Sequence, residues 1–153
     1  MRTDFQILPI ANDAFAHLTQ LTDDELALHQ AVRQTVNVNP GFPCRLTLED
    51  APVGEEVLLF PYLHQAVDGP YRAFGPVYVR PGAERFTPEV NEIPTMLKVR
   101  AQSLRAYDAN GMMVAATVAK GESVRPAFEK MFANALVAEV HLHNAKPGCF
   151  NCR

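Results

Sequence analysis

The sequence predicts an α+β fold with a mainly antiparallel sheet and three or four short helices. Segments in which apolar and polar residues alternate do not follow the regular strand, helix, strand order of a parallel sheet. The dipeptide Asn110-Gly111 lies between two such segments, as is typical of an antiparallel hairpin. The chain has 153 residues, of which 48% are hydrophobic, enough for one core. We therefore expect residues 1–153 to form a single globular domain.

The first part of the chain predicts one short strand and two helices. Phe5 and Ile7 precede a proline and indicate an opening strand, and a helix is expected after Asp13. Thr22 and Glu25 have the spacing of a capping box, in which each side chain accepts a hydrogen bond from the other residue's backbone amide. This pair predicts that a second helix begins at once.

The middle of the chain predicts strands separated by turns that contain proline and glycine. Alternating apolar residues indicate strands at 32–38 and 44–48. Residues 57–63 are apolar enough for a central strand, although a proline interrupts them. The Gly75-Pro76 pair is expected to break the segment 71–80 into two pieces.

The last third of the chain predicts a hairpin between helices, followed by a closing strand. The hairpin is expected to turn at Asn110-Gly111 with type I′ geometry, because both residues tolerate positive φ. In order, the expected elements are a helix at 92–100, the hairpin over 103–119, a helix from 124 to about 134, and the closing strand at 138–144.

Composition and charge narrow the classes of function. The chain has 14 basic and 17 acidic residues, and the basic ones are scattered, which argues against binding to nucleic acid. Residues 1–13 lack the apolar core of a signal peptide, and no apolar run approaches the roughly 20 residues of a membrane span. We expect a cytoplasmic protein without a membrane partner and without a disulfide. Composition does not determine the oligomeric state.

The last sixteen residues, AEVHLHNAKPGCFNCR, concentrate the side chains with the most varied chemistry. His141 and His143 lie two residues apart on the closing strand, so both imidazoles leave from the same face. A turn at Pro147-Gly148 would bring Cys149 back towards them. Histidine and cysteine are ligands that zinc prefers, so His141, His143 and Cys149 are the predicted metal ligands. The alternative is an exposed polar strand face whose imidazoles and thiols have no function.

A second group of polar residues surrounds the turn after the central strand. His64, Tyr71 and Arg72 lie there, and loops fixed by a scaffold are where binding residues tend to occur. Arg45, Arg72 and Arg80 would form a fork for a carboxylate or phosphate if the fold brings them together. Structural roles are the alternative, because a lone histidine is more often a hydrogen-bonded structural residue than a ligand.

Several motifs in a fixed order suggest a family relationship. They are Pro40-Gly41-Phe42-Pro43-Cys44-Arg45, Gly69-Pro70-Tyr71-Arg72-Ala73 with Gly75-Pro76, Ser103-Leu104-Arg105-Ala106-Tyr107-Asp108, and His143-Asn144-Ala145-Lys146-Pro147-Gly148-Cys149-Phe150. With these motifs, nearly the full chain resembles the uncharacterised bacterial proteins of the family called domain of unknown function 1203. The resemblance implies a stand-alone bacterial domain of this size. It implies no activity, substrate or catalytic residue.

Two functions from different classes remain open. The first is an enzyme with a small-ligand pocket, in which metal-assisted or His/Cys-based catalysis involves His64, His141, His143 and Cys149. The expected ligand-binding residues around this pocket are Arg45, Tyr71, Arg72 and Asn144.

The second is a non-catalytic module that binds a small anion or a protein partner through Arg45, Arg72 and Arg80. In this hypothesis the histidines are incidental. The two differ in metal content, because only the first expects zinc or another ion.

Overall fold

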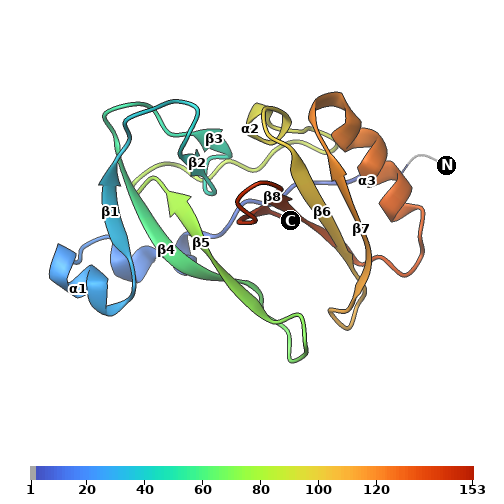
Figure 1. The fold of residues 1–153 in the computed structure, drawn as a ribbon, viewed down its shortest axis with the longest axis horizontal. Coiled ribbons are helices and arrows are strands. Elements are labelled where there is room, and N and C mark those ends of the chain that lie inside the picture. Colours follow the sequence, from blue (N-terminus) through green and yellow to red (C-terminus); the bar gives the residue numbers. More distant parts are fainter. Residues whose placement is uncertain (1–2) are drawn as a thin grey trace.

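The computed structural model describes residues 3–153, which form two sheets side by side (Figure 1). The first sheet has the order β1 (Val32–Thr35), β4 (Glu56–Gln65), β5 (Ala73–Val79), β2 (Pro43–Cys44) and β3 (Glu49–Asp50). The second has the order β7 (Met113–Ala119), β6 (Gln102–Tyr107), β8 (Glu139–Asn144) and β9 (Phe150–Cys152). All neighbouring strands are antiparallel except β2 and β5, which are parallel.

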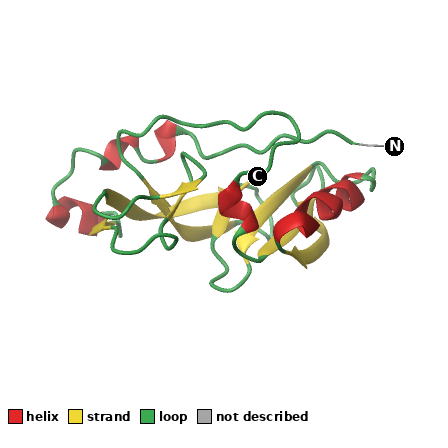
Figure 2. Ribbon diagram, turned by 90° about the horizontal axis from the view of Figure 1, so that it is seen from above, coloured by secondary structure: helices red, strands yellow, loops and turns green. Residues whose placement is uncertain are grey.

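Three short α-helices complete this α+β domain, as predicted. They are α1 (Asp23–Leu28), α2 (Thr95–Lys98) and α3 (Val124–Phe132), and short 3-10 turns lie at Asn12–Ala14, Ala16–Leu18 and Gly121–Ser123. The predicted capping box at the start of α1 is formed in both directions. In Figure 2 the helices, in red, are short and lie apart from one another around the strands, in yellow. None of the helices in residues 3–153 has the length and apolar content that a bilayer span requires.

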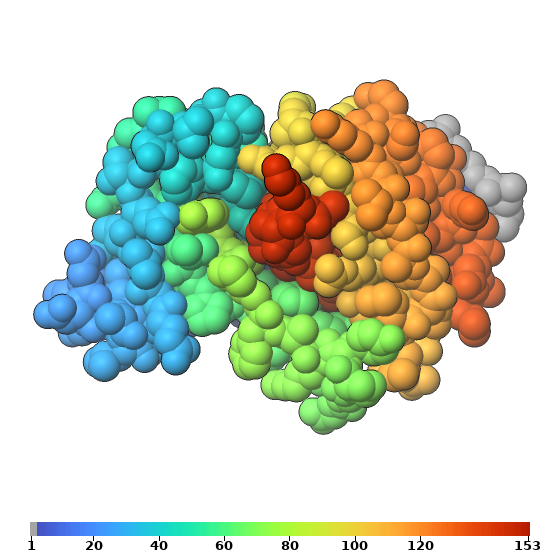
Figure 3. All heavy atoms as spheres, in the orientation of Figure 1, coloured from blue at the N-terminus to red at the C-terminus, as the bar shows by residue number. Residues whose placement is uncertain are grey.

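Each sheet has its own apolar core. The core of the second sheet lies under α3. Phe128 and Met131 of this helix belong to the same apolar cluster as Leu104 of β6 and Leu142 of β8. The core of the first sheet contains residues of the N-terminal turns and α1, such as Phe15 and Leu26. In Figure 3 the C-terminal residues, coloured red, lie at the centre of the molecule between the two halves. The C-terminal segment is therefore placed where the two sheets meet.

The predicted opening strand is wrong. Residues 3–11 form no strand of either sheet and make only isolated backbone hydrogen bonds. Leu8 exchanges two of them with Arg153, and the Ile10 amide donates one to the Arg45 carbonyl. Phe5 and Ile7 are still buried. The helix expected after Asp13 consists of two successive 3-10 turns.

Strand β5 continues through Gly75-Pro76, so the expected break is also wrong. Pro76 lies directly opposite Pro61 of β4. Strand β1 pairs with β4 only as far as Leu59, and β2 pairs with β5 only at Tyr78. Neither proline therefore removes a hydrogen bond from the sheet, since its missing N–H would face no paired strand.

The hairpin at Asn110-Gly111 is confirmed, but its turn is not type I′. Only Gly111 has positive φ, +78°, and its amide donates to the Asp108 carbonyl. The Asp108 carboxylate accepts hydrogen bonds from the amides of Asn110 and Met112. These contacts describe a type I turn followed by a left-handed glycine, which Asp at the first position favours.

Replacing Gly111 with valine is expected to lower the free energy of unfolding by about 2 kcal/mol or more. A β-branched residue resists this φ, and a Cβ here would lie 2.7 Å from Cγ1 of Val67. Chemical denaturation measures the change. Gly69→Val is the matched control, because the φ of Gly69 is not positive and a Cβ there would meet open space. Equal stabilities for the two variants would contradict the argument.

Candidate metal centre

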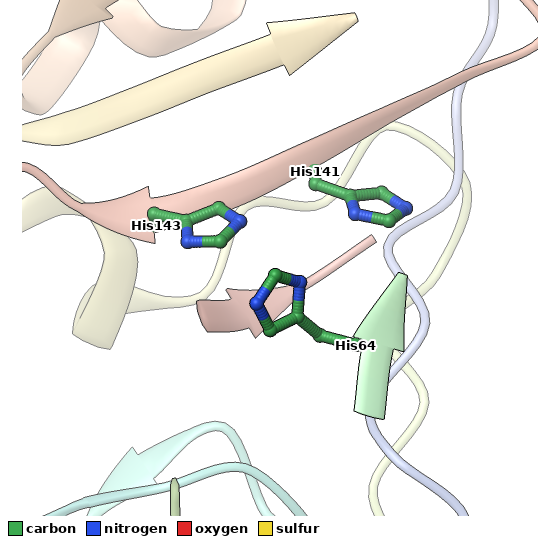
Figure 4. Close-up of side chains that lie close together, drawn as sticks. All are labelled: His64, His141 and His143. Atoms are coloured by element: carbon green, nitrogen blue, oxygen red, sulfur yellow. The ribbon is translucent and has the colours of Figure 1, made fainter. Parts of the chain in front are cut away.

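Three histidines from two different sheets meet in one cluster. His141 and His143 come from β8 and His64 from β4, and one ring nitrogen of each lies within 4.8 Å of the others. Figure 4 shows the three imidazoles close together, with His64 directed from β4 towards the two rings of β8. The prediction that His141 and His143 share a face of the closing strand is confirmed, because Val140 and Leu142 lie in the core on the other face. Such a cluster could hold a metal ion.

The face that carries the two β8 histidines is buried rather than exposed. His141 and His143 are each only 1% exposed. Strand β9 turns back beside β8 and pairs Phe150 with His143, and β5 of the first sheet packs near β9. Both faces of β8 are therefore covered, one by α3 and one by the first sheet, which corrects the alternative of an exposed polar strand face.

Hydrogen bonds fix the orientation and tautomer of both buried imidazoles. Nε2 of His141 lies 3.0 Å from a carboxylate oxygen of Glu139. Nδ1 of His143 lies 3.0 Å from the carbonyl oxygen of Gly148. Because a carbonyl only accepts, Nδ1 of His143 carries the proton and donates it. The carboxylate of Glu139 likewise accepts a hydrogen bond from Nε2–H of His141.

These bonds leave one nitrogen of each ring without a partner. Nδ1 of His64, Nδ1 of His141 and Nε2 of His143 are all buried and make no hydrogen bond with residues 3–153. Buried polar atoms normally find a partner, so three orphaned nitrogens in one cluster are unusual. In metal centres a histidine binds the ion through one nitrogen and donates its other N–H to a carboxylate or carbonyl. His141 and His143 have this arrangement.

Burial keeps these rings in the form that binds metals. Desolvation lowers the pKa of His64 to about 4 and that of His143 to about 3, with further lowering from Arg105 and from neighbouring histidines. Both imidazoles are therefore neutral at pH 7, with a free lone pair. The hydrogen bond from His141 lowers the pKa of the Glu139 carboxyl, so this partner is ionised.

Phe150 holds the three rings in place. The His64 ring stacks on it with centroids 5.4 Å apart and an angle of 7° between the planes. His141 and His143 contact the same ring edge-on, at 5.5 Å and 5.6 Å. One aromatic side chain thus fixes the distance between β4 and β8 at the cluster.

Arg105 and Tyr107 belong to the site but were not predicted. On β6 they lie opposite His141 and Glu139, on the same face. The Tyr107 and His141 ring centroids are 4.8 Å apart. The alternation of Ser103, Arg105 and Tyr107 with apolar residues was the available signal, since it places all three on one strand face.

A cavity of about 360 Å³ gives access to the cluster. His64, Arg105, His143 and Cys149 are among the side chains that line it. Ligands that enter would meet two of the three histidines, a guanidinium and a thiol. We predicted that Cys149 returns to the side of β8 that carries the histidines, and it does line the same cavity as His64 and His143.

The cluster that could hold a metal ion contains His64 and not Cys149, and the ligand role that we assigned to Cys149 stays a prediction. The turn before Cys149 directs its thiol towards other groups. Its Sγ lies 3.8 Å from the side-chain amide nitrogen of Asn144. The guanidinium of Arg45 also lies close to this thiol. All three cysteines, Cys44, Cys149 and Cys152, are free thiols.

The three arginines of the predicted fork have different partners and do not form one site. Arg45 is buried and donates to the carbonyls of Phe150 and Pro43. Arg80 forms a bidentate ion pair with the carboxylate of Glu55. Arg72 lies on the exposed loop and donates to the carbonyl of Val67.

The other predicted ligand-binding residues also have structural contacts. Tyr71 packs edge-on against Tyr107, with ring centroids 5.9 Å apart. Asn144 is buried and shares an amide network with Gln102 and Asn151. The catalytic and ligand-binding roles assigned to these residues and to His64, His141, His143 and Cys149 stay predictions.

Comparison with known proteins agrees with the resemblance found in the sequence. No curated protein and no solved structure matches the chain. A family model described as protein of unknown function (DUF1203) matches residues 41–153, which contain all three clustered histidines. Because this match covers well over half of its length, the chain belongs to the DUF1203 family.

Proposed function

We propose that this protein binds a transition metal ion, zinc in the first place, through His64, His141 and His143. The observation that carries the proposal is that each ring of this close cluster has one buried nitrogen without a hydrogen-bond partner. Hydrophobic or hydrogen-bonded packing would explain buried histidines, but it would not leave these lone pairs unused.

The donor set favours zinc among the common ions. Imidazole nitrogens suit zinc, copper, iron and nickel, whereas magnesium and calcium prefer oxygen ligands. Three protein ligands with an open position are typical of catalytic zinc, whereas structural zinc has four. The cavity beside His64 and His143 would give a small ligand access to that open position.

Metal-assisted chemistry on a small ligand is the activity that this centre would support. The ion would supply a Lewis acid. Arg105 would hold negative charge beside it, because its guanidinium lines the same cavity as His64 and His143. Glu139 and the Gly148 carbonyl would keep the two β8 imidazoles in the tautomers that bind the ion.

The test is a metal titration of the full chain. Protein stripped with a chelator is titrated with Zn²⁺ by calorimetry, and with Co²⁺, whose visible absorption reports nitrogen ligands in a tetrahedral or five-coordinate site. We expect one ion per chain and a higher melting temperature with zinc, because an ion that binds only the folded state stabilises it. Absence of stoichiometric binding for Zn²⁺, Co²⁺, Ni²⁺ and Cu²⁺ would refute the proposal.

The two remaining histidines provide a matched control. His17 and His29 are exposed, and their rings lie 5.7 Å apart, so they could bind an ion loosely at the surface. The His17→Ala/His29→Ala variant should retain the full stoichiometry and affinity for zinc. Loss of zinc in this variant would place the metal at the surface pair instead.

A further inference from the structure

A second cavity of the described chain is lined by none of the three clustered histidines. It measures about 620 Å³, within the range of small-molecule sites, and residues of both sheets line it. The metal proposal makes no use of this cavity.

The side chains around this cavity have an unusual charge. The whole sequence has more acidic than basic residues, 17 against 14. The cavity nevertheless has four basic side chains and no acidic one in its lining: Arg45, Arg100, Lys120 and Lys146. Of these, Arg100 is paired with Asp50, which does not line the cavity. The remaining positive charge faces the cavity without compensation.

Arg45 is the most unusual of these cations. It is 1% exposed, yet it has no carboxylate within 4.0 Å among residues 3–153. Its hydrogen bonds go to two backbone carbonyls, which carry only partial charge, and the nearest side-chain partner is the Cys149 thiol. Buried charges are normally paired, because removing them from water costs several kcal/mol. A bound anion would supply the missing partner.

We propose that this cavity binds a small organic anion, a carboxylate or a phosphate monoester on an apolar body. Arg45 would provide charge at the inner wall, and Lys120 and Lys146 would provide it at the exposed rim. Leu59, Pro76 and Tyr78 supply an apolar wall for the rest of the ligand. The predicted anion-binding role of Arg45 is kept, with the lysines in place of Arg72 and Arg80.

The cavity lies beside the proposed metal centre. Cys149, Pro76 and Pro147 line both this cavity and the smaller one that contains His64 and His143. A ligand anchored by the basic residues would thus extend towards the histidines past the Cys149 thiol. The anion site does not depend on the ion, so either proposal can fail without the other.

Calorimetric titration of the full chain with three related compounds tests the proposal. Benzoate and phenyl phosphate carry the two anionic groups, and benzamide is the neutral compound of the same shape. We expect one molecule of at least one anion to bind per chain, about tenfold more tightly than benzamide. Binding of only one anion identifies the charged group. Failure of both anions to saturate by about 10 mM, or equal binding of benzamide, would overturn the proposal.

A lysine variant locates the binding. Lys120→Ala/Lys146→Ala removes two exposed cations, so it should fold normally, and we expect it to weaken anion binding about tenfold. Lys130→Ala, at an exposed position on α3, is the control and should change nothing. Zinc affinity should be the same in all these proteins, and His64→Ala should still bind the anion. Unchanged anion affinity in the double variant would overturn the proposal.

Discussion

The His64→Ala variant is expected to bind zinc at least about 100-fold more weakly than the wild type, while keeping its fold. Loss of an outer partner of a metal ligand already costs about 10- to 100-fold in affinity, so loss of a ligand costs more. His64 is the best of the three to replace, because it is only partly buried. Competition titration with a chromophoric chelator measures the affinity, and circular dichroism checks the fold.

The same replacement at His29 is the control, since that ring is exposed and outside the cluster. His64→Ala should also melt at a slightly lower temperature without metal, because it loses the stacked contact with Phe150, worth about 1 kcal/mol. A variant that retains wild-type zinc affinity would mean that His141 and His143 bind the ion with some other third group, or that no ion binds there.

Two of the three clustered histidines could be placed together from the sequence, because their relative geometry is local. A strand has a period of two, so the spacing of His141 and His143 placed both rings on one face whatever the strand packed against. His64 could not be assigned in the same way. Its position in the cluster depends on how β4 approaches β8 from another sheet, and no spacing along the chain encodes that contact.

The choice between His64 and Cys149 shows the same limit. Cys149 is close to the histidines in sequence, and the turn at Pro147-Gly148 does return it to their cavity. The side chain of Cys149 instead lies beside Asn144 and beside Arg45, which is distant in sequence. Nearness in sequence therefore predicted the cavity that Cys149 lines, but not which residues form the cluster.

The fold class followed from the pattern of strands and helices, but several strand limits did not. Apolar alternation at 44–48 predicted a strand of five residues, whereas β2 contains only Pro43 and Cys44. Leu46 and Leu48 are nevertheless buried, so the pattern reported burial rather than backbone pairing. Prolines were misleading for a related reason, since their effect on a sheet depends on which neighbouring strand pairs there.

Burial on β8 also changes what replacement of its histidines should do. From the sequence, these rings were expected on a face outside the core, so their loss would leave stability almost unchanged. Because His141 and His143 are as buried as Leu142, we now expect either alanine variant to be destabilised even without metal. Thermal unfolding of the metal-free proteins distinguishes this effect from the loss of the ion.

Leu142→Ala is expected to lower the free energy of unfolding by about 2–5 kcal/mol while leaving the zinc ligands in place. Leu142 is 1% exposed and packs in the core beneath α3 with Leu104 and Phe128, so truncation leaves a cavity that rigid neighbours cannot fill. Denaturant titration measures the loss. The same change at Leu28, which is 83% exposed, is the control and should stay within about 0.5 kcal/mol of wild type.

Zinc should still bind to folded Leu142→Ala with one ion per chain, because this side chain and the imidazoles leave β8 from opposite faces. Wild-type stability for Leu142→Ala would contradict the placement of this side chain in the core beneath α3.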